Sequence, residues 1–537
     1  AASRGEANYD VVEILFRPES AVRAAAVEAG EVDIAMWLTP EQCESINKRA
    51  ETRCEGRASP ETIVIGMDQV DNPLLGDNRI RKAMILALDR ETMVDEFFDN
   101  QATIATQMAG PGAFGWNPNL VAHPYDPDQA RALVAEAKAD GVPVDEVEIR
   151  ILILQEAWSR SDEFALAFQQ ALLDIGLNVP ELMIRERSTV QPWLAEKPPS
   201  GTRDDDGQAW SIVIPFGHGN EIFDYLGSMG HLRCENAWSK VCYDDIDAAT
   251  VAAGPLTGTD RQAALYDIAE LLHEKLYTIP VAHLDLSYGI NNRIDWTIPL
   301  DHKIIAKHVW PAGTKPAAAP AAAAPSGDRS TLRMAVTEEP AGLDGWRTYK
   351  AESGPGMLNM VETLISRDPD TNALVGELAT GWEPVDELTW RFTLREGVTF
   401  HDGSPFNAEV AAFMINMNYS EEYNYEPRLF MGPQISATEV DDFTIDITTA
   451  EPDPILPARV YMAGITSLKQ IQEDPDSYST HPIGSGPYKF VEWRRGDRLV
   501  MEANPDWWGA GAASRGEAAF DVVEILFRPE SAVRAAA

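Results

Sequence analysis

The chain has 537 residues, of which 85 are Asp or Glu and 44 are Lys or Arg, so its formal net charge at pH 7 is −41. This surplus of acid excludes nucleic acid as a partner, because a phosphate backbone requires a basic binding face. A hydrophobic content of 45% and this length are typical of a globular protein of two or more domains, and no stretch approaches the ~20 apolar residues of a membrane helix. From the first residues, we expect a soluble chain without an export signal.

The predicted elements alternate between strands and helices along the whole chain. The first strand is DVVEILF (10–16), ended by Arg-Pro, and the next segment (19–30) is a helix that begins at Glu19 and ends at Gly30. Further helices are predicted, each behind an Asp, Ser or Asn cap, at 78–98, 126–141, 161–176 and 260–276. Further strands are predicted at 147–154, 209–216, 331–339, 388–397 and 443–450. This alternation indicates α/β layers in two lobes.

Four cysteines form two close pairs, Cys43 with Cys54 and Cys234 with Cys242. The chain lacks the paired Cys-x2-Cys units or nearby histidines that zinc prefers, so a metal site is not expected. We interpret the pairs as two short-loop disulfides, with reduced thiols as the alternative. Disulfides indicate an exported protein.

The first 26 residues return at the end of the chain. Residues 1–26 and 512–537 differ only at Asn8/Ala519 and Tyr9/Phe520. An Ala/Pro tract at 315–328, KPAAAPAAAAPSGD, is typical of an extended spacer that joins domain ends. These features indicate a conventional order of 330–511 followed by 1–310. A circular permutant and a window cut from a tandem array both account for it.

The duplicated segment carries one strand and one helix, and a single fold has one place for them. We therefore expect one copy to dock and the other to fray or to dock on a neighbouring chain. A monomer is expected, and the duplicated segment leaves a domain-swapped oligomer open.

Several blocks, read in the conventional order, carry a family resemblance. They are ETLISRD (362–368), GELATGWEPVDELTWRFTLREGVTFHDGSPFNAEV (376–410), HPIGSGPYKFVEWRRGDRLVMEANPDWWG (481–509), GEVDIA (30–35), NPLLGDNRIRKAMILALDRETMV (72–94) and HPYDPDQARALVAEA (123–137). The chain resembles the extracytoplasmic solute-binding proteins of ABC importers, family 5, which includes oligopeptide, dipeptide and nickel binders.

The resemblance implies an α/β fold of the two-lobed periplasmic-binding-protein type II class (cluster C), with a hinge and an extra small subdomain. Lobe II is expected at 51–284, the small subdomain at 361–450, the linker at 311–329 and the duplicate at 512–537. The rest of lobe I is expected at 1–50, 285–310, 330–360 and 451–511.

The resemblance also implies where ligand contacts lie, which is in a cleft between the lobes. The matching positions are Trp346, Tyr349, Tyr425, Arg428, Phe216, His218, Glu221 and Asp224, and Trp37, just after GEVDIA, is a further aromatic candidate. Peptide-binding relatives carry an aspartate near His218 that accepts the α-amino group of the ligand, so this sequence departs from them there. Glu221 and Asp224 are nearby carboxylates that remain available for a cation.

The resemblance implies a protein without catalysis and without cofactors. It implies that the lobes close around a small, peptide-like organic ligand and that the closed form docks on an ABC permease in the membrane. The expected location is the periplasm or the cell surface of a bacterium, there with a lipid tether. Two alternatives remain: a switching or domain-swapping module engineered on this fold, and a hydrolase whose catalytic groups converge only after folding.

Overall fold

The computed structural model describes residues 11–17, 19–69, 72–98, 101–154, 158, 160–185, 212–218, 220, 222–234, 241–314, 331–336, 339–340, 342–344, 354–420, 435–495, 498–509 and 522–527. The chain forms two compact units: unit 1 comprises Ala1–Arg57 and Leu286–Ala537, and unit 2 comprises Ala58–Asp285. Two strands carry the chain from one unit into the other, β3 (Thr52–Met67) and β8 (Ile279–Asn291). Unit 2 is close to the range 51–284 expected for lobe II, and the other boundaries stay predictions.

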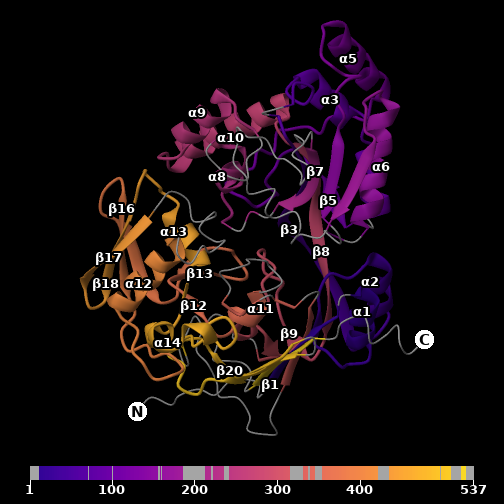
Figure 1. Ribbon diagram of the computed structural model, residues 1–537. Helices are drawn as coiled ribbons and strands as arrows, with labels where there is room; N and C mark the ends of the chain where they lie inside the picture. Colours follow the sequence, from indigo (N-terminus) through magenta and orange to yellow (C-terminus); the bar gives the residue numbers. More distant parts are fainter. Residues whose placement is uncertain are drawn as a thin grey trace. The chain divides into compact units, whose positions relative to one another are not determined.

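The main sheet of unit 1 mixes parallel and antiparallel strands. In it β11 runs parallel to β2, β2 runs antiparallel to β8, and β20 and β21 form an antiparallel pair. The strands are β2 (Ile34–Ala35), β11 (Thr331–Val336), β20 (Tyr488–Arg494) and β21 (Arg498–Ala503). Helices α1 (Ser20–Glu28) and α2 (Pro40–Asn47) lie side by side in Figure 1 and share a small apolar core. Gly30 follows α1 with φ of +71°, a conformation that a residue without Cβ adopts easily.

The two duplicated strands, β1 (Val11–Phe16) and β22 (Val522–Phe527), are assigned to the same place, between β11 and β21. Leu332 is in register with Val12 of one copy and with Val523 of the other, and Met501 is in register with the same two residues. Each backbone N–H or C=O on the facing strand edges pairs once, so only one copy fits at a time. The two copies therefore share one place in the sheet, and which copy docks and whether the other frays stay predictions.

A second sheet of unit 1 is antiparallel, in the order β15-β16-β18-β17, and α12 (Ala408–Tyr419) packs against it (Figure 1). Its strands are β15 (Ala379–Pro384), β16 (Thr389–Leu394), β17 (Ile435–Asp441) and β18 (Thr444–Thr449). Three short pairs complete the described strands of this unit: β9 (Ile294–Asp295) with β10 (Trp310–Pro311), β12 (Glu362–Thr363) with β19 (Gly464–Ile465), and β13 (Ile365–Arg367) with β14 (Leu374–Gly376). The short helices are α11 (Gly354–Met357), α13 (Leu456–Arg459) and α14 (Leu468–Glu473), with 3-10 turns at Ala306–His308, Val460–Met462 and Pro475–Ser477.

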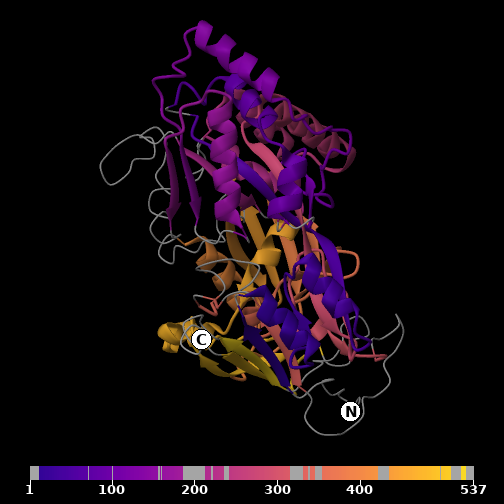
Figure 2. The same cartoon turned by 90° about the vertical axis from the view of Figure 1, so that its right-hand side faces the viewer.

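Unit 2 contains a mixed sheet in the order β8-β3-β7-β5-β6, with β4 paired to β8. Its strands are β4 (Ala102–Ile104), β5 (Arg150–Leu154), β6 (Glu181–Arg185) and β7 (Ile212–His218). Its helices are α3 (Asn78–Leu86), α4 (Arg90–Phe97), α5 (Pro127–Ala139), α6 (Ser161–Asp174), α8 (Tyr225–Ser228), α9 (Asp244–Ala253) and α10 (Gly258–Lys275), with a 3-10 turn at Met229–Leu232. Helix α6 covers β5 and β6, as Figure 2 shows from the side.

Most predicted elements are present, but the single helix predicted at 78–98 is wrong. The segment is two helices, α3 and α4, because Asp89 accepts a hydrogen bond from Thr92 N at 3.1 Å and starts a second helix. The prediction of a Ser, Asp or Asn cap also fails twice. Arg160 precedes α6 in a left-handed conformation, and Thr257 precedes α10 without a side-chain cap bond.

Both predicted disulfides are confirmed. Cys43 is bonded to Cys54, with their Cα atoms 5.1 Å apart, and Cys234 is bonded to Cys242, with their Cα atoms 4.5 Å apart. The first closes the segment from α2 to β3 in unit 1, and the second closes the segment before α9 in unit 2.

Candidate functional site

The structure describes only part of the ligand-contact set predicted from the sequence. Trp346, Tyr349, Tyr425, Arg428 and Glu221 lie outside the described residues, as does the side chain of His218. Trp37 belongs to unit 1, whereas Phe216 and Asp224 belong to unit 2.

Trp37 follows β2 and has an unusual backbone. Its φ is +52°, in the left-handed region, where a bulky side chain costs about 1–3 kcal/mol. Its side chain is partly buried against the main core of unit 1, and its indole Nε1 is buried without a hydrogen-bond partner among the described residues. A buried indole N–H normally donates to an acceptor.

The left-handed turn at Trp37 is held by Arg23 of α1. Arg23 is only 3% exposed, and it donates from Nε to Met36 O at 2.8 Å and from Nη2 to Trp37 O at 3.0 Å. Its Nη1 donates to Arg17 O. Burial lowers the pKa of Arg23 to about 10, which leaves the side chain charged at neutral pH. One buried cation therefore joins the end of β1 to the turn that carries Trp37.

In unit 2, the predicted contacts lie at the end of β7. Phe216 is in register with Val64 of β3 and is partly buried against the core that contains Tyr225. His218 ends the strand opposite Thr62.

The carboxylate of Asp224 is occupied by the protein itself. Arg261 donates to it from Nε at 3.0 Å and from Nη2 at 2.8 Å, and Leu226 N donates to Oδ1 at 2.9 Å. Asp224 and Arg261 are 4% and 3% exposed. The described partners of Asp224 therefore give it a structural role, as the start of α8 and half of a buried ion pair.

A loop at 110–117 pairs with the Asp224 segment through Phe114 and also carries Trp116, and the sequence analysis identified neither aromatic residue. Phe114 N donates to Phe223 O at 2.8 Å, and Tyr225 N donates to Phe114 O at 2.9 Å. Phe114 is 40% exposed, and the buried Nε1 of Trp116 has no partner among the described residues. The sequence did contain a signal for them, which is two aromatic residues in a glycine-rich loop. The glycines supply the tight turns of this loop, so the turns do not explain the aromatic residues.

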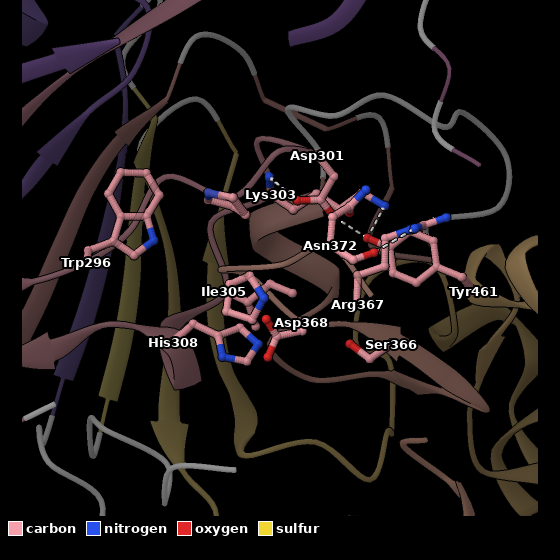
Figure 3. A pocket seen from close by; sticks show the side chains of 12 residues that line it. Trp296, Asp301, Lys303, Ile305, His308, Ser366, Arg367, Asp368, Asn372 and Tyr461 are labelled. Carbon is pink, nitrogen blue, oxygen red and sulfur yellow. Dashed lines mark hydrogen bonds between the residues drawn. The ribbon is translucent and has the colours of Figure 1, made fainter. Parts of the chain in front are cut away.

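A small pocket, partly open to solvent, lies in unit 1, and none of its lining residues is among the predicted ligand contacts. Figure 3 shows Asp301, Lys303 and Tyr461 close together on one side and His308 facing Asp368 on another. Lys303 Nζ donates to Tyr461 OH at 2.8 Å and lies 4.0 Å from the centre of its ring. Tyr461 OH donates to Asp301. The pocket is lined by Trp296, Pro299, Asp301, Lys303, Ile305, His308, Ser366, Arg367, Asp368, Pro369, Asn372 and Tyr461.

A buried acidic pair in unit 1 was also missed by the sequence analysis. Glu362 accepts hydrogen bonds from Ser485 Oγ at 2.9 Å, Trp507 Nε1 at 3.1 Å and Trp508 Nε1 at 2.6 Å. Lys307 Nζ donates to Glu377 at 2.6 Å and lies 4.0 Å from Glu362. Burial, with the nearby charge of Glu377, raises the pKa of Glu362 to about 7, although Lys307 opposes the shift. The cluster joins segments distant in sequence, so it is a structural junction.

The described residues also bear on two other classes of site. Within the ranges given above, no group of three or more His, Cys, Asp or Glu side chains is arranged to hold a metal ion. Over the same ranges, no helix has both the length and the apolar character needed to cross a bilayer.

Comparison with known proteins places this chain in a family. The family model described as bacterial extracellular solute-binding proteins, family 5, matches residues 3–194 and 373–537. A protein of Pseudomonas aeruginosa named a probable di/tripeptide-binding protein 5 is 24% identical over 287 residues, which are 52% of this chain and 51% of that protein. The glutathione-binding protein GsiB of Pectobacterium atrosepticum is 36% identical over 157 residues, which are 28% of this chain and 29% of that protein.

The solved structure of HbpA2 from Haemophilus parasuis is similar with a TM-score of 0.44 and 19% identity, over 53% of this chain and 55% of that one. The chain spans about half or less of the length of the curated relatives named above. The family match extends over more than half of the chain. The chain therefore belongs to family 5 of the bacterial extracellular solute-binding proteins, and it has the α/β, type II periplasmic-binding-protein fold that the sequence predicts.

Proposed function

We propose that this chain is the substrate-binding component of an ABC importer and that it binds a small organic ligand, a short peptide or a peptide-like molecule. Family membership supports the binding role, and relatives named for di- and tripeptides and for glutathione support the ligand class. The chain delivers its ligand to a permease in the membrane, acts outside the cytoplasm, free or lipid-tethered, and leaves the ligand chemically unchanged.

The observation that carries the proposal is the state of Trp37. A strained backbone, an unmatched buried indole N–H and a buried arginine that holds the turn occur together at this one residue. Strain of this kind persists where the surrounding structure enforces it, and it concentrates at ligand sites. A peptide carbonyl is a suitable acceptor for the indole N–H.

Unit 2 contributes its own contacts in this proposal. Phe216 and the exposed Phe114 offer apolar surface, and Trp116 offers a second unmatched indole N–H. The sequence-predicted residues Trp346, Tyr349, Tyr425, Arg428, His218 and Glu221 remain proposed contacts. A ligand stabilises the conformation to which it binds more tightly, which is the population shift that a transport receptor uses.

The first test is a thermal-shift screen of the purified chain against di- to pentapeptides, glutathione, amino acids, oligosaccharides, opines and nickel chelates. A ligand at 100 times its Kd adds about 2.7 kcal/mol to the free energy of unfolding, so a binder raises the Tm by several degrees. We expect hits among the peptides. A cooperative melt that no peptide shifts, or a shift by sugars alone, contradicts the proposed ligand class.

A variant then tests the role of Trp37. Trp37→Phe keeps an aromatic ring but removes the N–H, and we expect the affinity for the best peptide to fall about tenfold because its acceptor loses a donor. The matched control is Trp382→Phe, on β15 in the second sheet of unit 1, which should leave the affinity unchanged. Equal peptide affinities for the two variants would show that the Trp37 N–H does not bind the ligand. Mass spectrometry of the recovered ligand checks that it is released intact, and cleavage would favour the hydrolase alternative.

A further inference from the structure

One position in the main sheet of unit 1 has two candidate strands within the same chain. Thr331, Leu332 and Arg333 of β11 are in register with Val11, Val12 and Glu13 of β1. The same residues are in register with Val522, Val523 and Glu524 of β22. On the other side, residues 500–502 of β21 pair antiparallel with both copies, again in one register.

This position is internal to the sheet, so it has to be filled. An empty place between β11 and β21 leaves two facing rows of backbone N–H and C=O groups without partners and separates β20 and β21 from the rest of the sheet. Because β1 and β22 have the same sequence, VVEILF, they offer the same side chains in the same order. Either copy therefore presents the same residues to the position.

The two copies are not held equally. The pairing of β1 with β11 extends over the whole strand, from Val11 to Phe16, and continues with a hydrogen bond from Arg17 N to Val336 O of 2.8 Å. The pairing of β22 with β11 covers only Val522–Glu524. Arg23 also donates to Arg17 O and so ties the end of β1 to the turn after β2. The matching positions of the second copy, 528 and 534, lie outside the described residues.

We propose that the position between β11 and β21 is a strand-binding slot for which β1 and β22 of the same chain compete, with β1 as the major occupant and β22 as the replacement. The partner for this slot is thus a named segment, Val522–Phe527. Exchange of one copy for the other keeps the sheet complete, so the slot is never left open. The inference does not depend on the identity of the ligand.

Cysteine pairs across the register test the proposal directly. Val500 is in register with Glu13 in one arrangement and with Glu524 in the other. Two double variants, E13C/V500C and E524C/V500C, are treated with a short thiol crosslinker, and the linked peptides are quantified by mass spectrometry. Among the described residues all cysteines are in disulfides, so the new thiols are the ones that react. The matched controls, I14C/V500C and I525C/V500C, move one cysteine by one residue and so to the opposite face of its strand.

We expect crosslinks within single chains for both in-register variants, more of E13C/V500C than of E524C/V500C, and little for the controls. Deleting residues 1–16 from the E524C/V500C variant should raise its crosslinking several-fold while the melt stays cooperative. Deleting residues 512–537 as well should abolish the cooperative melt of unit 1.

Two results would overturn the proposal. One is a crosslinked fraction of E524C/V500C that is no larger than that of I525C/V500C, both in the full chain and after residues 1–16 are deleted. The other is crosslinks that form only between chains and increase with chain concentration, because the replacement strand would then come from a second molecule.

Discussion

The Nε atom of Arg23 lies 2.8 Å from the backbone oxygen of Met36, so a helix of the duplicated segment directly holds the turn that presents Trp37. The same guanidinium donates to Trp37 O and to Arg17 O. The strand, the helix and the proposed ligand contact are therefore linked by one buried side chain.

The first prediction concerns this arginine. In Arg23→Met the carbonyls of Met36 and Trp37 lose their donor, so we expect the free energy of unfolding to fall by about 2–4 kcal/mol and peptide affinity to fall about tenfold. Denaturant unfolding and calorimetric titration measure the two effects. Arg534 holds the matching place in the second copy, so Arg534→Met is the control and should change stability by less than about 0.5 kcal/mol. Equal losses in the two variants would mean that β1 is not the major occupant of its slot.

A second prediction separates structure from binding at Asp224. Asp224→Asn weakens a buried, bidentate ion pair and leaves Arg261 without a compensating charge, which costs about 3–5 kcal/mol. We expect a lower Tm with an unchanged peptide Kd in the fraction that stays folded. Adding Arg261→Gln should recover part of the lost stability, since no buried charge then remains. A large change in the peptide Kd at an unchanged Tm would instead show that Asp224 contacts the ligand.

The third prediction is a pH dependence caused by Glu362. Burial and the charge of Glu377 raise its pKa from 4.5 to about 7 in the folded state. The native state therefore holds this proton more tightly than the unfolded state does. The contribution of Glu362 to stability is complete below pH 4.5 and is lost as the pH rises towards 7.

Glu362→Gln removes this titration. Urea unfolding of both proteins between pH 4.5 and 8 measures their free energies of unfolding. As the pH rises, the free energy of the variant should increase relative to that of the parent by an amount on the order of a few kcal/mol. A difference between the two proteins that stays constant across this range would contradict the raised pKa.

The fourth prediction is a loss of stability as the pH falls, caused by His283. Burial lowers the pKa of His283 from 6.5 to about 4, and its Nδ1 lies 2.9 Å from Thr62 Oγ1. The unfolded state takes up a proton below pH 6.5 that the native state does not, so stability is lost as the pH falls from 6.5 towards 4. We expect His283→Gln to lose less stability than the parent over this interval, by up to about 3 kcal/mol. His481→Gln, at an exposed position, is the control and should follow the parent.

Local patterns were sufficient for most of the fold. Strand-like segments predicted β16 and β18, a capped helical segment at 126–141 predicted α5, and two close cysteine pairs predicted both disulfides. Each of these patterns involves only residues close together in the sequence, so it can be recognised without knowledge of the rest of the chain. The segment 78–98 was misjudged because its apolar spacing continues through Asp89, where the cap that starts α4 breaks the helix.

The candidate site was less accessible from the sequence. Asp224 looked like a free carboxylate, but Arg261, 37 residues away, occupies it. Phe114 belongs to no motif, and its place beside the Asp224 segment comes from backbone hydrogen bonds between separate loops. The cluster of Glu362, Glu377 and Lys307 likewise joins residues whose proximity no spacing indicates.

By itself, the sequence determined the family, the alternation of helices and strands, the disulfides and the existence of two copies of one strand. Each of these is encoded in neighbouring residues or in direct repetition. Only the tertiary structure decided that both copies share one register on β11 and β21, that Arg23 holds the turn at Trp37, and that burial moves the pKa of Glu362 upwards. The physical reason is that strand pairing, burial and charge neighbours depend on segments far apart in the chain, which only folding brings together.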